Sequence, residues 1–187
     1  MMGERSIGFE AVVLPKNSPN LTNPPMTSSF PLNALKGRMA EHLVQDLFIQ
    51  NEYNVFNFGL ERVMPSLSKL LKTNNQKTSK ELRFMPDFVV QSMQNGDLFY
   101  LEVKFRADGF FSFDERYADY PYHNAWFVIV SPEKMQCMHY KRLKAGYGIR
   151  PDSKYELSRV KSFHIDPAVL AEYEDYARQV FAGFKKA

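Results

Sequence analysis

One pair of apolar runs joined by an Asn-Gly turn constrains this chain more than any other feature. Residues 83–90 (RFMPDFVV) and 98–106 (LFYLEVKFR) are rich in aromatic and β-branched side chains. Between them lies the sequence Gln94-Asn95-Gly96-Asp97. Asn-Gly is the strongest short-range signal of a β-hairpin, because both residues tolerate positive φ. The sequence therefore predicts two antiparallel strands that meet at this turn.

The predicted hairpin gathers charged side chains on one face of a sheet. If Asn95 and Gly96 form a two-residue loop, Asp87 lies opposite Lys104 and Val89 opposite Glu102, whereas a three-residue loop moves the pairing by one. Side chains alternate along a strand, so Glu102 and Lys104 share a face, with Asp87 beside them. Two carboxylates and an ammonium on one sheet face are costly unless they pair, bind a metal or take part in chemistry.

The order of these residues resembles that of a known superfamily. Pro86-Asp87, fourteen further residues and then Glu102-Val103-Lys104 resemble the signature of the PD-(D/E)xK nucleases, which have the restriction-endonuclease-like fold. The string KGRMAE at residues 36–41, ahead of an apolar helix, is similar to the first helix of Holliday-junction-resolvase-like nucleases. A second match, Pro151-Asp152-Ser153-Lys154, lies in a polar turn without apolar strands around it.

The resemblance implies an α/β fold with an αβββαβ core, in which helices flank a central mixed sheet. It also implies a Mg²⁺-dependent or Mn²⁺-dependent endonuclease that cuts DNA. Asp87 and Glu102 would be metal ligands, joined by the backbone carbonyl of Val103 and, through water or a second ion, by Glu41. Mg²⁺ prefers carboxylate oxygens and retains waters, so few carboxylates suffice. Lys104 would orient the attacking water or stabilise the charge on the phosphate.

Two alternatives stay open at this stage. The chain could be a catalytically inactive nucleic-acid-binding or scaffolding protein with a nuclease-like fold. The charged residues could also form a purely structural network, Asp87 with Lys104 and Glu102 with Arg106. The complete set of two carboxylates and a lysine favours the enzyme, and exposed ion pairs contribute little stability.

The length and composition of the chain limit the classes of protein to which it can belong. A chain of 187 residues with 44% hydrophobic content is large enough for one domain with a sizeable core. No apolar run approaches the roughly 18 residues of a membrane span, and the N-terminus lacks the pattern of a signal peptide. The single cysteine, Cys137, excludes an intramolecular disulfide, and we expect a reducing, cytoplasmic setting.

The domain prediction divides the chain at about residue 32. Residues 1–32, with a Pro/Asn/Ser/Thr-rich tract, are expected to be an N-terminal arm or linker, and residues 33–187 a single nuclease-like domain. Its core would cover about 33–131, followed by C-terminal strands and a helix over 132–187. Periodicity predicts a helix over 33–50, strands over 53–58, 125–131, 135–140 and 160–165, and a last helix from Pro167 capped by Asp166.

Basic residues suggest where nucleic acid would bind. The net charge is only +3, but residues 134–161 contain eight Lys or Arg against two acids, which suits a polyanion. Residues 72–80 (KTNNQKTSK) have no apolar side chain and predict a mobile basic loop ahead of the Asp87 strand. We expect nucleic-acid contacts from Lys72, Lys77, Lys80, Arg83, Arg106, Arg116 and Tyr117. The superfamily often works as homodimers, but nothing in this sequence specifies one.

Overall fold

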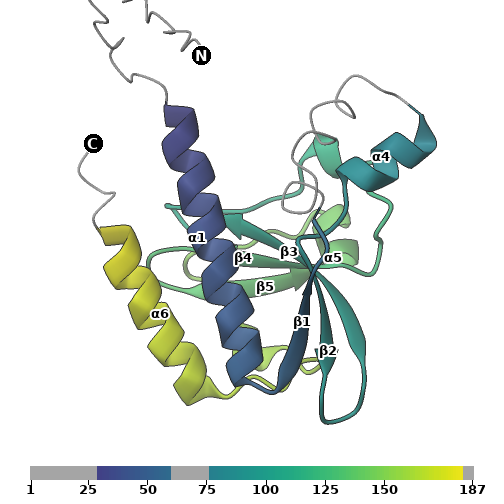
Figure 1. The fold of residues 1–187 in the computed structure, drawn as a ribbon. Coiled ribbons are helices and arrows are strands. Elements are labelled where there is room, and N and C mark those ends of the chain that lie inside the picture. Colours follow the sequence, from purple (N-terminus) through teal and green to yellow (C-terminus); the bar gives the residue numbers. More distant parts are fainter. Residues whose placement is uncertain (1–28, 60–75, 183–187) are drawn as a thin grey trace, which may run out of the picture.

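The computed structural model describes residues 29–59 and 76–182. In chain order the elements are α1 (Ser29–Gln50), β1 (Tyr53–Asn57), α4 (Lys77–Arg83), β2 (Phe88–Ser92), β3 (Leu98–Phe105), the 3₁₀ helix η1 (Glu115–Tyr117), β4 (Trp126–Val130), β5 (Met135–His139), α5 (Tyr140–Lys144), the 3₁₀ helix η2 (Leu157–Arg159) and α6 (Pro167–Ala182). The prediction of an α/β fold, with a central mixed sheet flanked by helices, is confirmed (Figure 1).

The sheet has five strands in the order β1-β2-β3-β4-β5. Strands β3 and β4 are parallel and every other neighbouring pair is antiparallel. The crossover from β3 to β4 contains the short helix η1 where an αβββαβ core would have an α-helix. Within this crossover, Phe111 forms a β-bridge with Ile149, and each backbone N–H donates to the other's carbonyl at 3.0 and 2.7 Å. This bridge holds the chain extended there.

The hairpin forms, but its register differs from the one predicted for a two-residue loop. Phe88 pairs with Leu101 and Gln91 with Leu98, so the pairing of Asp87 with Lys104 is wrong by two residues. A longer turn over 93–97 causes the shift, with Gly96 at a φ of 78° and its N–H bonded to the Ser92 carbonyl at 2.9 Å. Because side chains alternate with a period of two, a slip of two residues leaves every side chain on its predicted face.

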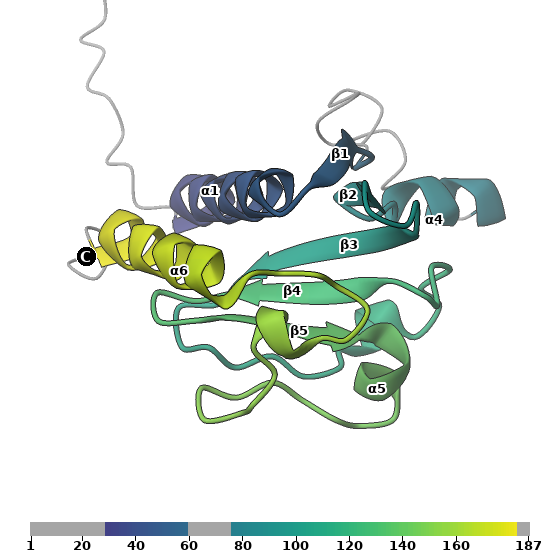
Figure 2. The same cartoon turned by 90° about the horizontal axis from the view of Figure 1, so that it is seen from below.

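Helices α1 and α6 lie side by side on one face of the sheet (Figures 1 and 2). Ala40, Val44 and Leu47 of α1 are fully buried there with Leu170 and Phe181 of α6. Helix α1 begins at Ser29, four residues before the predicted start at Asn33. Pro31 lies in its first turn, where proline is tolerated because backbone N–H groups have no partner within the helix.

Loops and α5 cover the other face of the sheet (Figure 2). Their core is aromatic, with Tyr120, Phe127 and Tyr140 almost fully buried and in mutual ring contact at centroid distances of 5.3–6.3 Å. Phe127 projects onto this face, whereas its neighbour Val128 belongs to the cluster that contains the buried residues of α1 and α6. The core under the helices is mainly aliphatic, although it includes rings such as Phe48 and Phe163, and the core under the loops is richer in aromatic residues. We call these the aliphatic face and the aromatic face of the sheet.

Three local predictions have different outcomes. The last helix begins at Pro167 as expected, and Asp166 caps it, since its Oδ1 accepts a hydrogen bond from the N–H of Ala168 at 2.7 Å. The predicted strand over 160–165 is wrong: this segment follows η2 as turns, and the edge of β5 pairs instead through Gln136 and Glu156. The predicted loop over 72–80 is wrong from Lys77 onward, where α4 begins; residues 72–75 lie outside the described part.

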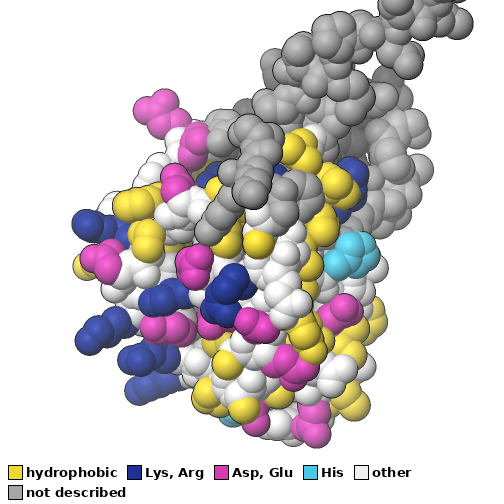
Figure 3. All heavy atoms as spheres, turned by 90° about the vertical axis from the view of Figure 1, so that its left-hand side faces the viewer, with side chains coloured by type: hydrophobic (Ala, Val, Ile, Leu, Met, Phe, Trp, Pro, Cys, Tyr) yellow, Lys and Arg dark blue, Asp and Glu magenta, His cyan; other side chains and the backbone are white. Residues whose placement is uncertain are grey.

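Charge is mixed on the face of the molecule that Figure 3 shows. Lys and Arg side chains gather on one part of this face, and Asp and Glu side chains are spread among and beside them. A net charge of +3 thus does not produce a field of one sign here. Within the described residues, no helix combines the length and the apolar character needed to cross a bilayer.

Candidate active site

Asp87 lies where β2 and β3 separate. The last pair between these strands is Phe88 with Leu101, so Asp87 and Glu102 are the next residues on each side. The backbone carbonyl of Asp87 accepts from the N–H groups of Phe58 and Gly59 at 3.0 and 3.2 Å. Its side-chain Oδ2 accepts from the N–H of Val103 at 2.7 Å. These bonds fix the Asp87 carboxylate at the fork between the two strands.

Glu102 and Lys104 project from β3 onto the aromatic face of the sheet. Their partners in β4 are Phe127 and Ile129, both of which belong to the aromatic core. The Nζ of Lys104 lies 2.5 Å from Oε1 of Glu102. The Glu102 side chain is only 10% exposed and that of Lys104 is 26% exposed, so the ion pair is buried at its acidic end and reaches solvent at its basic end.

The surroundings shift the pKa values of both partners. The pKa of Glu102 is raised to about 7, mainly by burial and also by the charges of Asp87 and Glu41, against the lowering effect of Lys104. Burial alone would lower the pKa of Lys104, but the charges of Glu102 and Asp87 outweigh it and the pKa is raised. Lys104 is therefore held in its charged form, and the carboxylates of Asp87 and Glu41 add negative charge around Glu102.

Glu41 acts on this site from a different element. It is a half-buried residue of α1, the helix that packs on the aliphatic face. Its charge contributes to the raised pKa of Glu102, which brings the carboxylates of α1, the start of β2 and the middle of β3 into one electrostatic environment. Val103 is buried on the aliphatic face, and its amide already binds Asp87.

The donor set can be compared with what a metal ion needs. In the described residues, no group of three or more His, Cys, Asp or Glu side chains forms a ready-made cage for a metal. Mg²⁺ does not need one, because it keeps several waters and binds through one or two carboxylates. Asp87 and Glu102 supply two neighbouring carboxylates, and the charge of Glu41 also acts on Glu102. The residues fit a water-rich Mg²⁺ or Mn²⁺ site and not an all-protein cage.

A cavity of about 230 Å³ lies just beyond the end of β3 and is lined by residues 106–117, not by the carboxylates. Arg106, two residues beyond Lys104 in the sequence, lines it together with Tyr117 and Phe111. The Arg106 guanidinium lies 5.3 Å from the centre of the Phe111 ring, an arrangement that holds a planar cation in place. The tyrosine is close enough to Lys104 to affect its pKa. Tyr117 thus links this cavity to the surroundings of Lys104.

The prediction of a structural network that pairs Glu102 with Arg106 is wrong. Glu102 binds Lys104, and Arg106 donates through Nη1 to the Phe105 carbonyl at 3.0 Å. The Asp87 side chain accepts a hydrogen bond from the amide of Val103. The ion pair of Lys104 is with Glu102, not with Asp87 as predicted.

The other predicted nucleic-acid contacts are distributed over two short helices. Lys77 and Arg83 are exposed on α4, where Lys77 lies 3.9 Å from Glu81 and Arg83 lies 5.6 Å from the Phe84 ring centre. Lys80 belongs to α4 and Arg116 to η1. Lys72 lies outside the described residues. Their contacts with nucleic acid stay predictions.

A similarity to a known protein is found at the level of structure. No protein-family model matches the sequence, and the search of curated proteins gives no significant match. Among solved structures, the chain is similar to Hjc of Archaeoglobus fulgidus, a Holliday junction resolvase from an archaeal hyperthermophile. The identity is 14% over 73% of this chain and 98% of that chain, with a TM-score of 0.39.

Tyr120 is a candidate that sequence reasoning missed. It is fully buried, and its hydroxyl has no hydrogen-bond partner among the described residues. Its ring contacts Phe84, three residues before Asp87, and Phe127, the partner of Glu102, at centroid distances of 5.9 and 5.6 Å. Burial raises the Tyr120 pKa, and the charges of Glu102 and Asp87 raise it further. In the sequence, Tyr120 is one aromatic among many, and only the fold brings its hydroxyl near the carboxylates.

Proposed function

We propose that this protein is a metal-dependent endonuclease that hydrolyses phosphodiester bonds in DNA. The observation that carries the proposal is the arrangement at the strand fork. Asp87 and Glu102 are adjacent across the fork, and a partly exposed lysine is bound to Glu102. Two neighbouring carboxylates can hold a divalent ion, and a lysine beside them can stabilise negative charge on a phosphate. The proposal rests on this geometry alone.

The metal would be Mg²⁺ or Mn²⁺, held by Asp87 and Glu102 with the Val103 carbonyl, and through water by Glu41. When bound, it would polarise the phosphate and lower the pKa of a bound water. The protein's own contribution is positional. The amide of Val103 orients the Asp87 carboxylate, and Glu102 holds Lys104 with its ammonium partly in solvent, where it can contact a phosphate oxygen or the attacking water.

The cavity beyond the end of β3 would take the strand on one side of the cut. Arg106 and Tyr117 line it, and a guanidinium can bind a phosphate through two parallel hydrogen bonds. Lys77, Lys80, Arg83 and Arg116 would add phosphate contacts that position the strand without reading its sequence. A homodimer would present two such sites and could cut both strands of a duplex.

The test is incubation with supercoiled, linear, single-stranded and four-way-junction DNA in Mg²⁺, Mn²⁺ or EDTA. We expect cleavage that needs a divalent ion and that is lost in Asp87→Asn and Lys104→Ala. Asp87→Asn keeps an oxygen that can accept the Val103 amide, so the variant should fold. The matched control is Asp46→Asn, which removes a carboxylate from an exposed position of α1.

One result would refute the enzyme. If the protein retains DNA without cutting any of these substrates, and if the same substitutions leave retention unchanged, it is a binding protein with this fold.

A further inference from the structure

A second pocket lies beside β5, with β4 between it and the strand that carries Glu102 and Lys104. It has a volume of about 240 Å³ and lies between the β4–β5 pair and residues 154–162. Trp126, at the start of β4, pairs with His139 at the end of β5, and both line the pocket. Pockets for drug-sized ligands span about 300–1,000 Å³, so this one has room for a single small unit.

Part of the pocket wall is aromatic and held in place. Trp126 is half-buried, and its ring is 4.9 Å from His139 and 5.2 Å from Phe163, centre to centre. Tyr155 is half-buried, and its backbone carbonyl accepts from the N–H of Cys137 at 2.8 Å. Rings that are fixed before binding lose little entropy when a flat ligand stacks on them.

The guanidinium of Arg142 lies at the same pocket and is held by its neighbours. Arg142 lies 4.8 Å from the ring centre of Tyr147 and 5.2 Å from that of Tyr155. Its Nη2 is also 3.4 Å from the Tyr155 hydroxyl. Contacts with two aromatic rings orient the planar group, and these rings carry no charge that would neutralise it.

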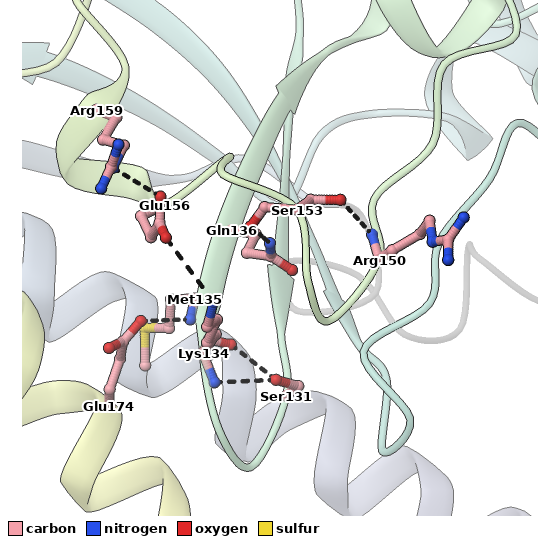
Figure 4. A network of polar contacts seen from close by, with 9 residues as sticks. All are labelled: Ser131, Lys134, Met135, Gln136, Arg150, Ser153, Glu156, Arg159 and Glu174. Carbon is pink, nitrogen blue, oxygen red and sulfur yellow. Dashed lines mark hydrogen bonds and ion pairs between the residues drawn. The ribbon is translucent and has the colours of Figure 1, made fainter.

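Glu156, the acidic residue that lines the pocket, already forms ion pairs with other residues. Glu156 lies 2.8 Å from Arg159 and 3.8 Å from Lys134, both drawn in Figure 4. Within residues 29–59 and 76–182, no acidic side chain pairs with Arg142, Lys154 or Lys161, although all three line the pocket. Three cations around one small space repel one another, and an anion bound between them would relieve that repulsion.

We propose that this pocket binds one nucleotide unit, with the base against Trp126 and Tyr155 and the phosphate among Arg142, Lys154 and Lys161. An aromatic wall beside uncompensated cations suits a ligand that carries both a flat ring and a phosphate. A free phosphate would not use the rings, and an acidic peptide would not need them. The site is separate from the carboxylates at the strand fork and does not depend on the proposed nuclease activity.

Trp126 makes the proposal directly measurable, because it is the only tryptophan in the chain. The experiment titrates the full chain in EDTA with adenosine 5′-monophosphate while tryptophan fluorescence is followed. EDTA removes divalent ions, so the result is independent of any cleavage. We expect a saturable change with the mononucleotide and a much weaker one with adenosine or inorganic phosphate alone. A thymidine hexanucleotide distinguishes the two sources of the ligand: tighter binding than the mononucleotide assigns the pocket to a nucleic-acid strand, and equal binding assigns it to free nucleotides.

Matched variants locate the binding. Arg142→Ala and Lys154→Ala should each raise the dissociation constant by about fivefold or more, as expected for the loss of one charge-assisted contact. Lys144→Ala removes a cation from α5, the helix of Arg142, but does not line the pocket, and it should leave the constant unchanged. The proposal is overturned if no nucleotide changes the fluorescence saturably. It is also overturned if Lys144→Ala weakens binding as much as the pocket variants, or if a hexaglutamate peptide binds as tightly as the nucleotides.

Discussion

The strand fork and the pocket beside β5 are built in opposite ways. At the fork, Asp87, Glu102 and Lys104 lie on or beside strands and are tied to backbone and to one another. At the pocket, Arg142, Lys154 and Lys161 come from α5 and the segments after it, and none has an acidic partner in the described part of the chain. The fork brings carboxylates together, and the pocket brings cations together.

This difference shows how one sheet can hold two sites of opposite charge. Strands fix carboxylates at short distances and bury them, which favours a cation between them. Loops and short helices carry cations at the edge of the sheet, where solvent screens their repulsion until an anion arrives. Since β4 separates the two sites, we expect substitutions at one to leave the other unchanged.

The largest expected effect is the loss of cleavage in Asp87→Asn. The variant removes a metal ligand's charge but keeps an acceptor for the Val103 amide, so cleavage should fall by about 10²–10³-fold or more while the fold persists. The tryptophan fluorescence response to adenosine 5′-monophosphate should stay as in the wild type. A variant that loses both properties would contradict the independence of the two sites, provided that its circular dichroism spectrum is unchanged.

The next effect concerns stability and its dependence on pH. The pKa of Glu102 is raised to about 7 in the folded protein, so between roughly pH 4.5 and 7 the folded state holds a proton that the unfolded state has lost. Stability from this group is present at low pH and falls as pH rises, by up to about 3 kcal/mol. Glu102→Gln should lack this fall.

Urea unfolding in EDTA at pH 5 and pH 8 measures this fall in the free energy of unfolding. The control is Glu52→Gln, which changes an exposed glutamate just before β1. If the wild type and Glu102→Gln differ in unfolding free energy by the same amount at both pH values, the raised pKa is contradicted.

Metal affinity should depend on pH through the same residue. Because a divalent ion must displace the proton of Glu102, Mg²⁺ affinity should rise by up to about tenfold per pH unit below pH 7 and level off above it. Calorimetric titration at several pH values checks this. Glu102→Gln should bind more weakly and without that slope; a slope that persists in the variant would assign the proton to another group.

The smallest effect is expected at Tyr120. The Tyr120 hydroxyl is buried and has no hydrogen-bond partner among the described residues. Such a hydroxyl gives no stabilisation and costs desolvation, so Tyr120→Phe should leave the unfolding free energy unchanged or raise it by about 1 kcal/mol. Tyr140→Phe is the contrasting variant, because the Tyr140 hydroxyl donates to the Tyr117 carbonyl at 2.9 Å and its loss should destabilise. A clear loss of stability in Tyr120→Phe, measured in EDTA, would mean that its hydroxyl is bonded in the folded protein.

Several elements could be predicted because short-range patterns specify them. The last helix has a proline at its first position, an aspartate cap and a spaced apolar face, and it forms as predicted. Strand β4 is a continuous apolar run and becomes a buried strand between two others. The segment 160–165 shows the limit: it has strand-forming residues, but Glu156 already occupies the edge of β5 beside Gln136.

The sequence by itself determined which side chains share a face at the fork. Alternation along β2 and β3 puts Asp87, Glu102 and Lys104 together, and that result survived a register slip of two residues because the period of a strand is two. Only the tertiary structure decided that Lys104 binds Glu102, that Glu41 of α1 acts on the same group, and that the Tyr120 ring packs beside it on Phe127. It also assembled the pocket from Trp126 and residues 137–162. These contacts join segments far apart in the chain, and no local periodicity encodes the distance between such segments.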